Sequence, residues 1–72
     1  MKAIIINNEI KFDKNALTLA EMGFEIGEEV EVFEVNGEYF MGAKREVVID
    51  GVVAVYKGEG FGVSSEEIEV LA

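Results

Sequence analysis

Residues 27–40 read GEEVEVFEVNGEYF, and apolar residues alternate with glutamates along this stretch until Asn36-Gly37. Alternation with a period of two predicts a β-strand that buries one face. The inward positions change phase within the stretch, and a β-bulge would absorb that change. The predicted inward residues are Val30, Val32, Phe33 and Val35, and the predicted outward residues are Glu29, Glu31 and Glu34.

Two dipeptides predict tight hairpin turns. Asn36-Gly37 leads into a strand over Glu38 to Met41. Asp50-Gly51 joins Glu46 to Ile49 with Val52 to Tyr56. Both dipeptides favour the type I′ turn, whose twist matches that of paired strands. We therefore expect two hairpins after residue 28.

The N-terminal part is predicted to hold a third, shorter hairpin and a helix. Ala3 to Asn7 and Ile10 to Phe12 flank Asn8-Glu9 and could pair. Asp13 is a plausible N-cap for one short helix over roughly residues 14–22, and Gly23 would end that helix.

The C-terminal part combines a loop, a turn and a last strand. Residues 58–62, Gly-Glu-Gly-Phe-Gly, form a loop, and Ser64 and Glu67 have the spacing of a capping box around a single turn. A strand over Ile68 to Leu71 follows. The order of elements over residues 28–71 resembles an SH3-like small barrel, preceded by the hairpin and helix of residues 1–27. We expect one mainly β domain in which the first and last barrel strands pair, with Glu29 and Glu31 beside Glu67 and Glu69.

Composition excludes most catalytic classes. The chain has 72 residues and lacks Cys and His. Disulfides, common zinc sites, thiolate nucleophiles and the imidazole base of most hydrolytic triads are therefore absent. No apolar run approaches the roughly 20 residues of a membrane span, and the run after Met1-Lys2 is too short for a signal peptide. We expect a cytoplasmic protein that is not an enzyme and uses no cofactor.

The net charge of −9 is unevenly distributed. Residues 1–14 and 44–57 each carry three cations against two acids. Residues 15–43 hold seven glutamates and residues 58–72 hold four, with no Lys or Arg in either segment. The excess of acid thus lies in two cation-free segments.

Other constellations are better explained as structure. Residues 58–62 lack the spacing and following helix of a phosphate loop, and Glu59 would repel phosphate. Glu28, Glu29 and Glu31 lack the Asp-rich loop of a calcium site, so we expect no metal site. Glu66 and Glu67 lack a pocket that would separate their pKa values. Most aromatic residues are predicted to be core, with Phe61 as an alternative exposed anchor; they are Phe12, Phe24, Phe33, Phe40, Phe61, Tyr39 and Tyr56.

Two interpretations of the acidity follow. An acidic surface maintains solubility and discourages pairing between strand edges. Alternatively, the acidic face is neutralised by a partner, because carboxylates on neighbouring strands can form an array comparable with the phosphates of a DNA groove. Direct binding to DNA is excluded, since the chain has six cations mixed with acids.

The small size, the missing Cys and His, and the runs GEEVEVFEVNGE and SSEEIEVL resemble the acidic DNA-mimic proteins that phages make against host systems. The resemblance implies an inhibitor in the host cytoplasm. Its partner would be a basic nucleic-acid-binding protein such as the nucleoid-associated protein HU, with a homodimer as a further state. The alternative is an SH3-like assembly module that binds a larger protein through apolar loop residues. The predicted partner-binding residues are Glu28, Glu29, Glu31, Glu34, Glu38, Glu66, Glu67 and Glu69.

Overall fold

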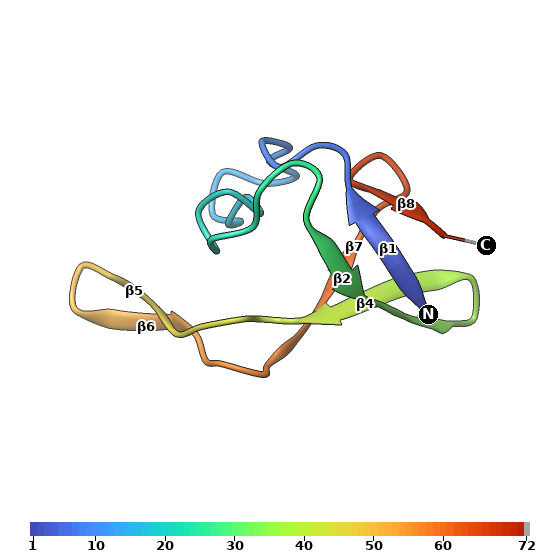
Figure 1. Ribbon diagram of the computed structural model, residues 1–72. Coiled ribbons are helices and arrows are strands. Elements are labelled where there is room, and N and C mark those ends of the chain that lie inside the picture. The colour runs from blue at the N-terminus through green and yellow to red at the C-terminus, as the bar shows by residue number, and fades with distance from the viewer. Residues whose placement is uncertain (72) are drawn as a thin grey trace.

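The computed structural model describes residues 1–71, which form strands and turns (Figure 1). Eight strands make three small sheets that do not close into a barrel. The predicted mainly β class is confirmed, whereas the SH3-like barrel is not observed. The strands are β1 (Lys2–Ile5), β2 (Glu29–Glu31), β3 (Phe33–Val35), β4 (Glu38–Gly42), β5 (Val47–Ile49), β6 (Val52–Val55), β7 (Gly60–Val63) and β8 (Ile68–Val70).

The first sheet has the order β2-β1-β8, and both pairings are antiparallel. The prediction that the terminal strand pairs with the strand at Glu29 is wrong, because β1 lies between them. The predicted N-terminal hairpin is also wrong, since residues 10–12 form no strand. The physical reason is burial. Ala3 and Ile5 of β1 are completely buried, because β1 in the centre of the sheet has a neighbouring strand on each side.

The second sheet has the order β3-β4-β7. Asn36 and Gly37 both have positive φ, at 51° and 83°, which confirms the predicted tight turn. The predicted inward positions on β3 are wrong, because Phe33 and Val35 are exposed. The chain passes from one sheet to the other at the fully buried Val32, whose N–H donates to the Met1 carbonyl (2.8 Å).

The hairpin of β5 and β6 forms the third sheet, and these strands pair only with each other among the described residues. Asp50 and Gly51 have φ of 51° and 78°, so this tight turn is confirmed as well. Figure 1 shows the hairpin projecting away from the rest of the chain, consistent with principal extents of 40 × 20 × 20 Å.

The predicted helix over 14–22 is wrong, because residues 1–71 contain turns but no helix. Asp13 Oδ1 accepts from the Asn15 N–H and so closes a local turn. A single turn follows at residues 18–23. Side-chain hydrogen bonds hold its beginning, and a glycine with positive φ ends it. Thr18 and Glu21 exchange reciprocal side-chain hydrogen bonds of 2.9 and 3.1 Å, which is a capping box. Gly23, which was predicted to end the helix, ends this single turn instead, with φ of 92°.

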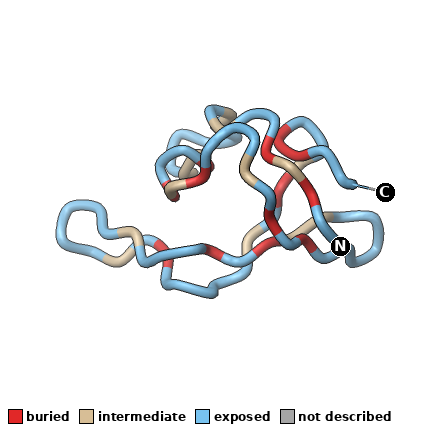
Figure 2. Tube along the Cα trace, in the orientation of Figure 1, coloured by how far each residue is buried: buried red, intermediate tan, exposed pale blue. Residues whose placement is uncertain are grey.

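One apolar core joins the two three-stranded sheets to the turn at 18–24 (Figure 2). Its largest fully buried side chains are Ile5, Val32 and Met41. Phe24 is buried and Phe61 packs against it, with ring centroids 6.2 Å apart. The core prediction fails for Phe12, Phe33 and Tyr56, which are exposed. None of residues 1–71 belongs to a helix of the length and apolarity that a membrane crossing needs.

Candidate protein-binding site

The outward face of the first sheet carries a short acidic row. Glu29 on β2 and Glu69 on β8 both lie opposite Ile4 of the central strand. Residues directly opposite in antiparallel strands share a face, and two strand spacings separate these glutamates by roughly 10 Å. The predicted placement of the two acidic segments side by side is therefore wrong, because Ile4 separates Glu29 from Glu69, although these two glutamates share one face of the sheet.

Glu31 is not free on this face. It lies opposite Lys2, whose Nζ is 3.3 Å from Glu31 Oε2, and the N-terminal ammonium is 3.1 Å from Oε1. Hydrogen bonds from the N-terminus and then from Lys2 lower the pKa of this carboxyl. One carboxylate of the cation-free segment 15–43 is thus neutralised by two cations from the start of the chain.

Glu28 is neutralised in the same way from the other direction. Lys44 Nζ lies 2.6 Å from Glu28 Oε2 and 2.8 Å from Oε1. This hydrogen-bonded ion pair is the main reason that the pKa of Glu28 is lowered. Lys44 also lies over the Phe24 ring, 4.6 Å from its centroid. Glu28 therefore belongs to an internal arrangement of carboxylate, ammonium and phenyl ring.

Glu67 is withdrawn from the surface, with only 3% of the residue exposed. Its Oε1 accepts from the Ser64 N–H (3.0 Å), and Ser64 Oγ accepts from the Glu66 N–H (3.2 Å). The predicted turn is confirmed, and the bond from Ser64 gives the buried carboxylate a hydrogen-bond donor. Desolvation raises the pKa of Glu67. Glu67 therefore adds almost nothing to the acidic outer surface.

Six of the eight predicted residues are exposed, and five of these remain when the paired Glu31 is set aside: Glu29, Glu34, Glu38, Glu66 and Glu69. None of them takes part in an ion pair among residues 1–71. They do not form one continuous array, because Glu34 and Glu38 lie on the second sheet. Glu34 lies opposite Tyr39, whereas Glu38 lies opposite Val35 on the other face of that hairpin.

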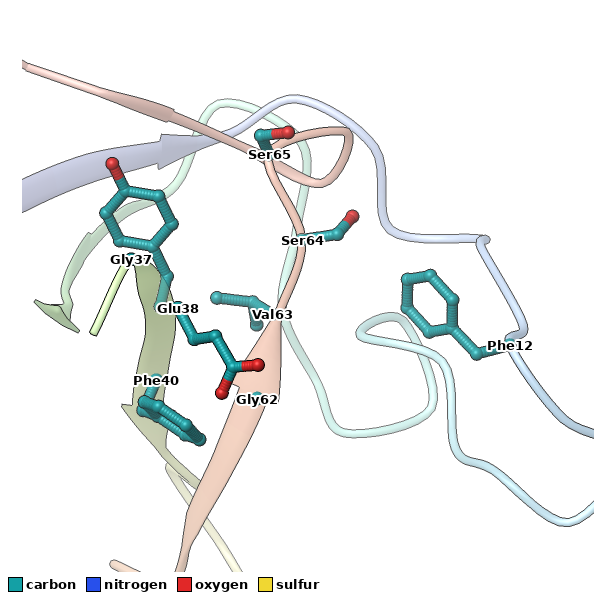
Figure 3. A pocket seen from close by; sticks show the side chains of 9 residues that line it. Phe12, Gly37, Glu38, Phe40, Gly62, Val63, Ser64 and Ser65 are labelled. Carbon is teal, nitrogen blue, oxygen red and sulfur yellow. The ribbon is translucent and has the colours of Figure 1, made fainter. Parts of the chain in front are cut away.

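Glu38 differs from the other four because it lines a cavity. This cavity has a volume of about 460 Å³ and lies against β4 and β7. Figure 3 shows the Glu38 carboxylate beside the Phe40 ring, with Phe12 on the opposite side of the cavity. Val63 and Ser64 form part of the wall between them. The cavity thus combines one charged group with two phenyl rings.

Phe12 was predicted to be core, yet 63% of it is exposed. It also lines a second cavity of about 330 Å³, whose wall includes Leu19, Val55 and Glu67. The two cavities share Phe12 and Gly62. The sequence gives no signal for this position, because the side chain is brought there by the irregular segment before Thr18.

β7 contains two glycines, Gly62 in the cavity wall and Gly60 two residues before it, and neither has a packing reason to lack a side chain. Gly62 lies opposite Phe40, and an added Cβ would meet the Phe40 ring only at ordinary contact distance, 3.8 Å. An added Cβ at Gly60 would meet nothing within 4 Å. Neither glycine has positive φ. Glycine inside a strand is common where another molecule approaches closely, and this pattern fits a contact surface.

No group of three or more acidic residues among the described part of the chain is arranged to hold a metal ion. Glu28 and Glu31 are each engaged by a cation instead. In comparisons with protein-family models, with curated proteins and with solved structures, nothing matches this chain. Its function must therefore be inferred from its own residues.

Proposed function

We propose that this protein binds a basic surface of another protein and that a Lys or Arg side chain of this partner enters the cavity at Glu38. The observation that carries the proposal is an exposed carboxylate, without an ion pair among residues 1–71, in a cavity between the Phe12 and Phe40 rings. A carboxylate selects a cation, and the rings select one with an apolar stem.

The chemistry has a parallel within the same chain. Lys44 lies between the Glu28 carboxylate and the Phe24 ring, at 2.6 Å from an oxygen and 4.6 Å from the centroid. Cations over phenyl rings gain about 0.5–1 kcal/mol at exposed sites. Glu38 with Phe12 and Phe40 offers the same two kinds of group to a cation from outside. Arg fits best, because its planar guanidinium can stack on a ring while it donates to a carboxylate.

The charge around the cavity supports the same class of partner. Net charge is −9, and besides Glu38 nine exposed glutamates have no ion pair among residues 1–71, four of them in the predicted set. A surface of one sign raises the rate of encounter with an oppositely charged partner. We therefore expect association that is fast at low salt and weaker at high salt.

An arginine-rich peptide is a direct probe of the cavity. Titrated into the ¹⁵N-labelled protein, it should shift the amide resonances of Phe12, Glu38 and Gly62 more than those of the β5–β6 hairpin. Glu38→Gln should reduce peptide affinity about two- to tenfold, since an exposed ion pair contributes about 0.5–1.4 kcal/mol. Glu9→Gln removes the same charge at an exposed position outside the cavity and the proposed contact surface, and is the control. Equal losses from both variants would contradict the cavity as the cation site.

We further propose that the partner is a nucleic-acid-binding protein whose basic track this protein occupies in place of DNA. Support comes from Glu29 and Glu69, which are both exposed and flank Ile4 on one face of the first sheet. The protein should displace a labelled DNA duplex from HU, and displacement should weaken with salt. Reversal of Glu29 and Glu38 to Lys should abolish displacement, whereas reversal of Glu9 and Glu46 should reduce it much less.

The DNA test is separate from the peptide test. If the peptide binds at Glu38 but DNA is never displaced, the partner is basic without being a nucleic-acid-binding protein of this kind. Equal losses from the two double reversals would show that bulk charge alone controls binding.

An assembly module that binds a larger protein through apolar residues is the second candidate. Phe33, with 60% of the residue exposed, and Val35 favour it, because both side chains face outward on β3. A complex formed through these residues should persist at high salt and weaken with Phe33→Ser. Salt dependence therefore separates the two candidate functions.

A further inference from the structure

The β5–β6 hairpin, residues 47–55, forms an arm with apolar residues on both faces. Val48 and Val53 form one cross-strand pair and Ile49 and Val52 the next, and successive pairs point to opposite faces. Val52 is 68% exposed, more than any other large apolar residue among residues 1–71. Val48 is the next most exposed residue of the arm, at 56%. At the base of the arm Val55 is buried in the core and Val47 packs against it, whereas Val48, Ile49 and Val52 beyond the base are exposed.

The sequence of the arm is that of a strand pair buried on both sides. It reads VVIDGVVAV, and its only charged residue is Asp50 in the turn. An antiparallel sheet with one face in water alternates apolar with polar residues, whereas strands covered on both faces form continuous apolar runs. An isolated two-stranded hairpin is at best marginally stable in water. The arm therefore has the composition of an element that another chain covers.

The distribution of charge indicates that the chain covering the arm is a second copy of this protein. Thirteen of the fifteen acidic residues lie outside residues 44–57, so most of the surface would repel a second copy. Residues 44–57 instead carry Lys44, Arg45 and Lys57 against Glu46 and Asp50. The arm is thus the surface through which two copies of this chain can meet without opposing their carboxylates.

We propose that two copies associate through their arms, which lie edge to edge about a two-fold axis and form one four-stranded sheet, so that cross-strand neighbours from the second copy cover part of the apolar side chains on both faces. Both long edges of the arm lack a partner strand among the described residues, and the arm projects clear of the remaining chain (Figure 1). An isologous contact of this kind closes at a dimer. The pairing supplies the additional strands that a stable small sheet needs. This inference is independent of the cation site at Glu38.

Sedimentation equilibrium over a dilution series tests the proposal. Wild-type protein should form a dimer whose dissociation constant does not rise with salt, because salt screens the repulsion between the acidic bodies. The double substitution Val48→Thr and Val52→Thr keeps β-branched residues and should raise that dissociation constant at least tenfold. Val35→Thr makes the same exchange at an exposed strand position outside the arm and should leave it unchanged.

A second measurement reports contact directly. The chain has no Cys, so Ala54→Cys allows a single nitroxide label on the exposed side of β6. In a mixture with unlabelled ¹⁵N protein, the nitroxide should broaden amide signals of residues 47–55 and not those of 33–35. A monomer at every concentration, dissociation promoted by Val35→Thr as strongly as by the arm variant, or broadening confined to 33–35 would each overturn the proposal. Capture of the arm by a larger protein while the chain stays monomeric would overturn it too.

Discussion

Lys44 and Glu28 form the shortest ion pair among residues 1–71, with 2.6 Å between Nζ and Oε2. Glu28 Oε1 also accepts from the Glu25 N–H (3.0 Å), so the same carboxylate closes the turn before β2. Lys44 lies in the connection from β4 to β5. The pair therefore fixes the base of the arm to the segment that enters the first sheet.

Removal of this pair should destabilise the protein modestly. Lys44→Met retains the apolar stem over Phe24 and removes the charge, and we expect a loss of about 0.5–1 kcal/mol in the free energy of unfolding, measured in urea. The pKa of Glu28 is lowered, so this stabilisation is complete above the ordinary value of 4.5 and is lost as pH falls through the folded-state pKa. The difference between wild type and Lys44→Met should accordingly shrink in acid. An equal difference at pH 3 and pH 7 would mean that the ammonium acts through Phe24 alone.

Glu67 should show the opposite dependence on pH. Burial raises its pKa, so the stability associated with the neutral form is complete below 4.5 and is lost as pH rises through the folded-state pKa. Glu67→Gln keeps an oxygen for the Ser64 N–H and removes the buried charge. Thermal unfolding should give a higher Tm than wild type at pH 7 and a similar Tm near pH 4. A lower Tm at pH 7 would reveal a partner for the ionised carboxylate.

The features that the sequence predicted correctly are local. Asn36-Gly37, Asp50-Gly51 and Gly23 each adopt positive φ, because the preference of these residues for that conformation does not depend on distant contacts. The Ser64–Glu67 turn is also local. Thr18-Leu-Ala-Glu21 carries the same capping-box spacing, and it could have been found by the rule that identified Ser64 and Glu67.

The features that were not predicted depend on contacts between distant residues. β1 pairs with strands far along the chain on both sides, and no local pattern distinguishes this from a hairpin with residues 10–12. The same applies to charge. The cation-free segment was interpreted as uncompensated, but Lys44 and the N-terminus reach Glu28 and Glu31 from outside it. Counting charges within a segment omits the partners that tertiary structure supplies.

The single turn at 18–23 should depend on its caps, because it is too short to be stable through helical hydrogen bonds alone. Thr18→Ala removes the oxygen that accepts from the Glu21 N–H and should cost about 1 kcal/mol of stability. Thr18→Ser retains that oxygen and should restore most of the loss. Urea denaturation of both variants checks this, and equal stability of Ala and Ser at this position would contradict a role for the hydroxyl.

Gly23 should tolerate substitution less well than glycines in the strands. Its φ of 92° costs an L-residue roughly 1–2 kcal/mol, and an added Cβ would lie 3.0 Å from Cζ of Arg45. Gly23→Ala should therefore lower the free energy of unfolding by at least about 1 kcal/mol. Gly60→Ala is the matched control, because Gly60 lacks positive φ and its Cβ would meet nothing within 4 Å. Equal effects of the two variants would show that Gly23 is not strained by a side chain.

Glu29 and Glu31 provide the sharpest comparison, since both lie on β2, face outward and carry one charge. Glu31 is held by the N-terminal ammonium and Lys2, whereas Glu29 lies across Ile4 from Glu69 and has no ion pair among residues 1–71. Glu31→Gln should therefore lower the Tm, and Glu29→Gln should leave it unchanged or raise it, although the net charge changes equally. Added salt should reduce the difference between the two variants, because both effects are electrostatic at exposed groups. The comparison also bears on function: a carboxylate that can be removed without loss of stability, yet is needed to displace DNA, is maintained for binding. A Tm that falls equally in both variants would instead make Glu29 a structural residue and remove it from the proposed contact surface.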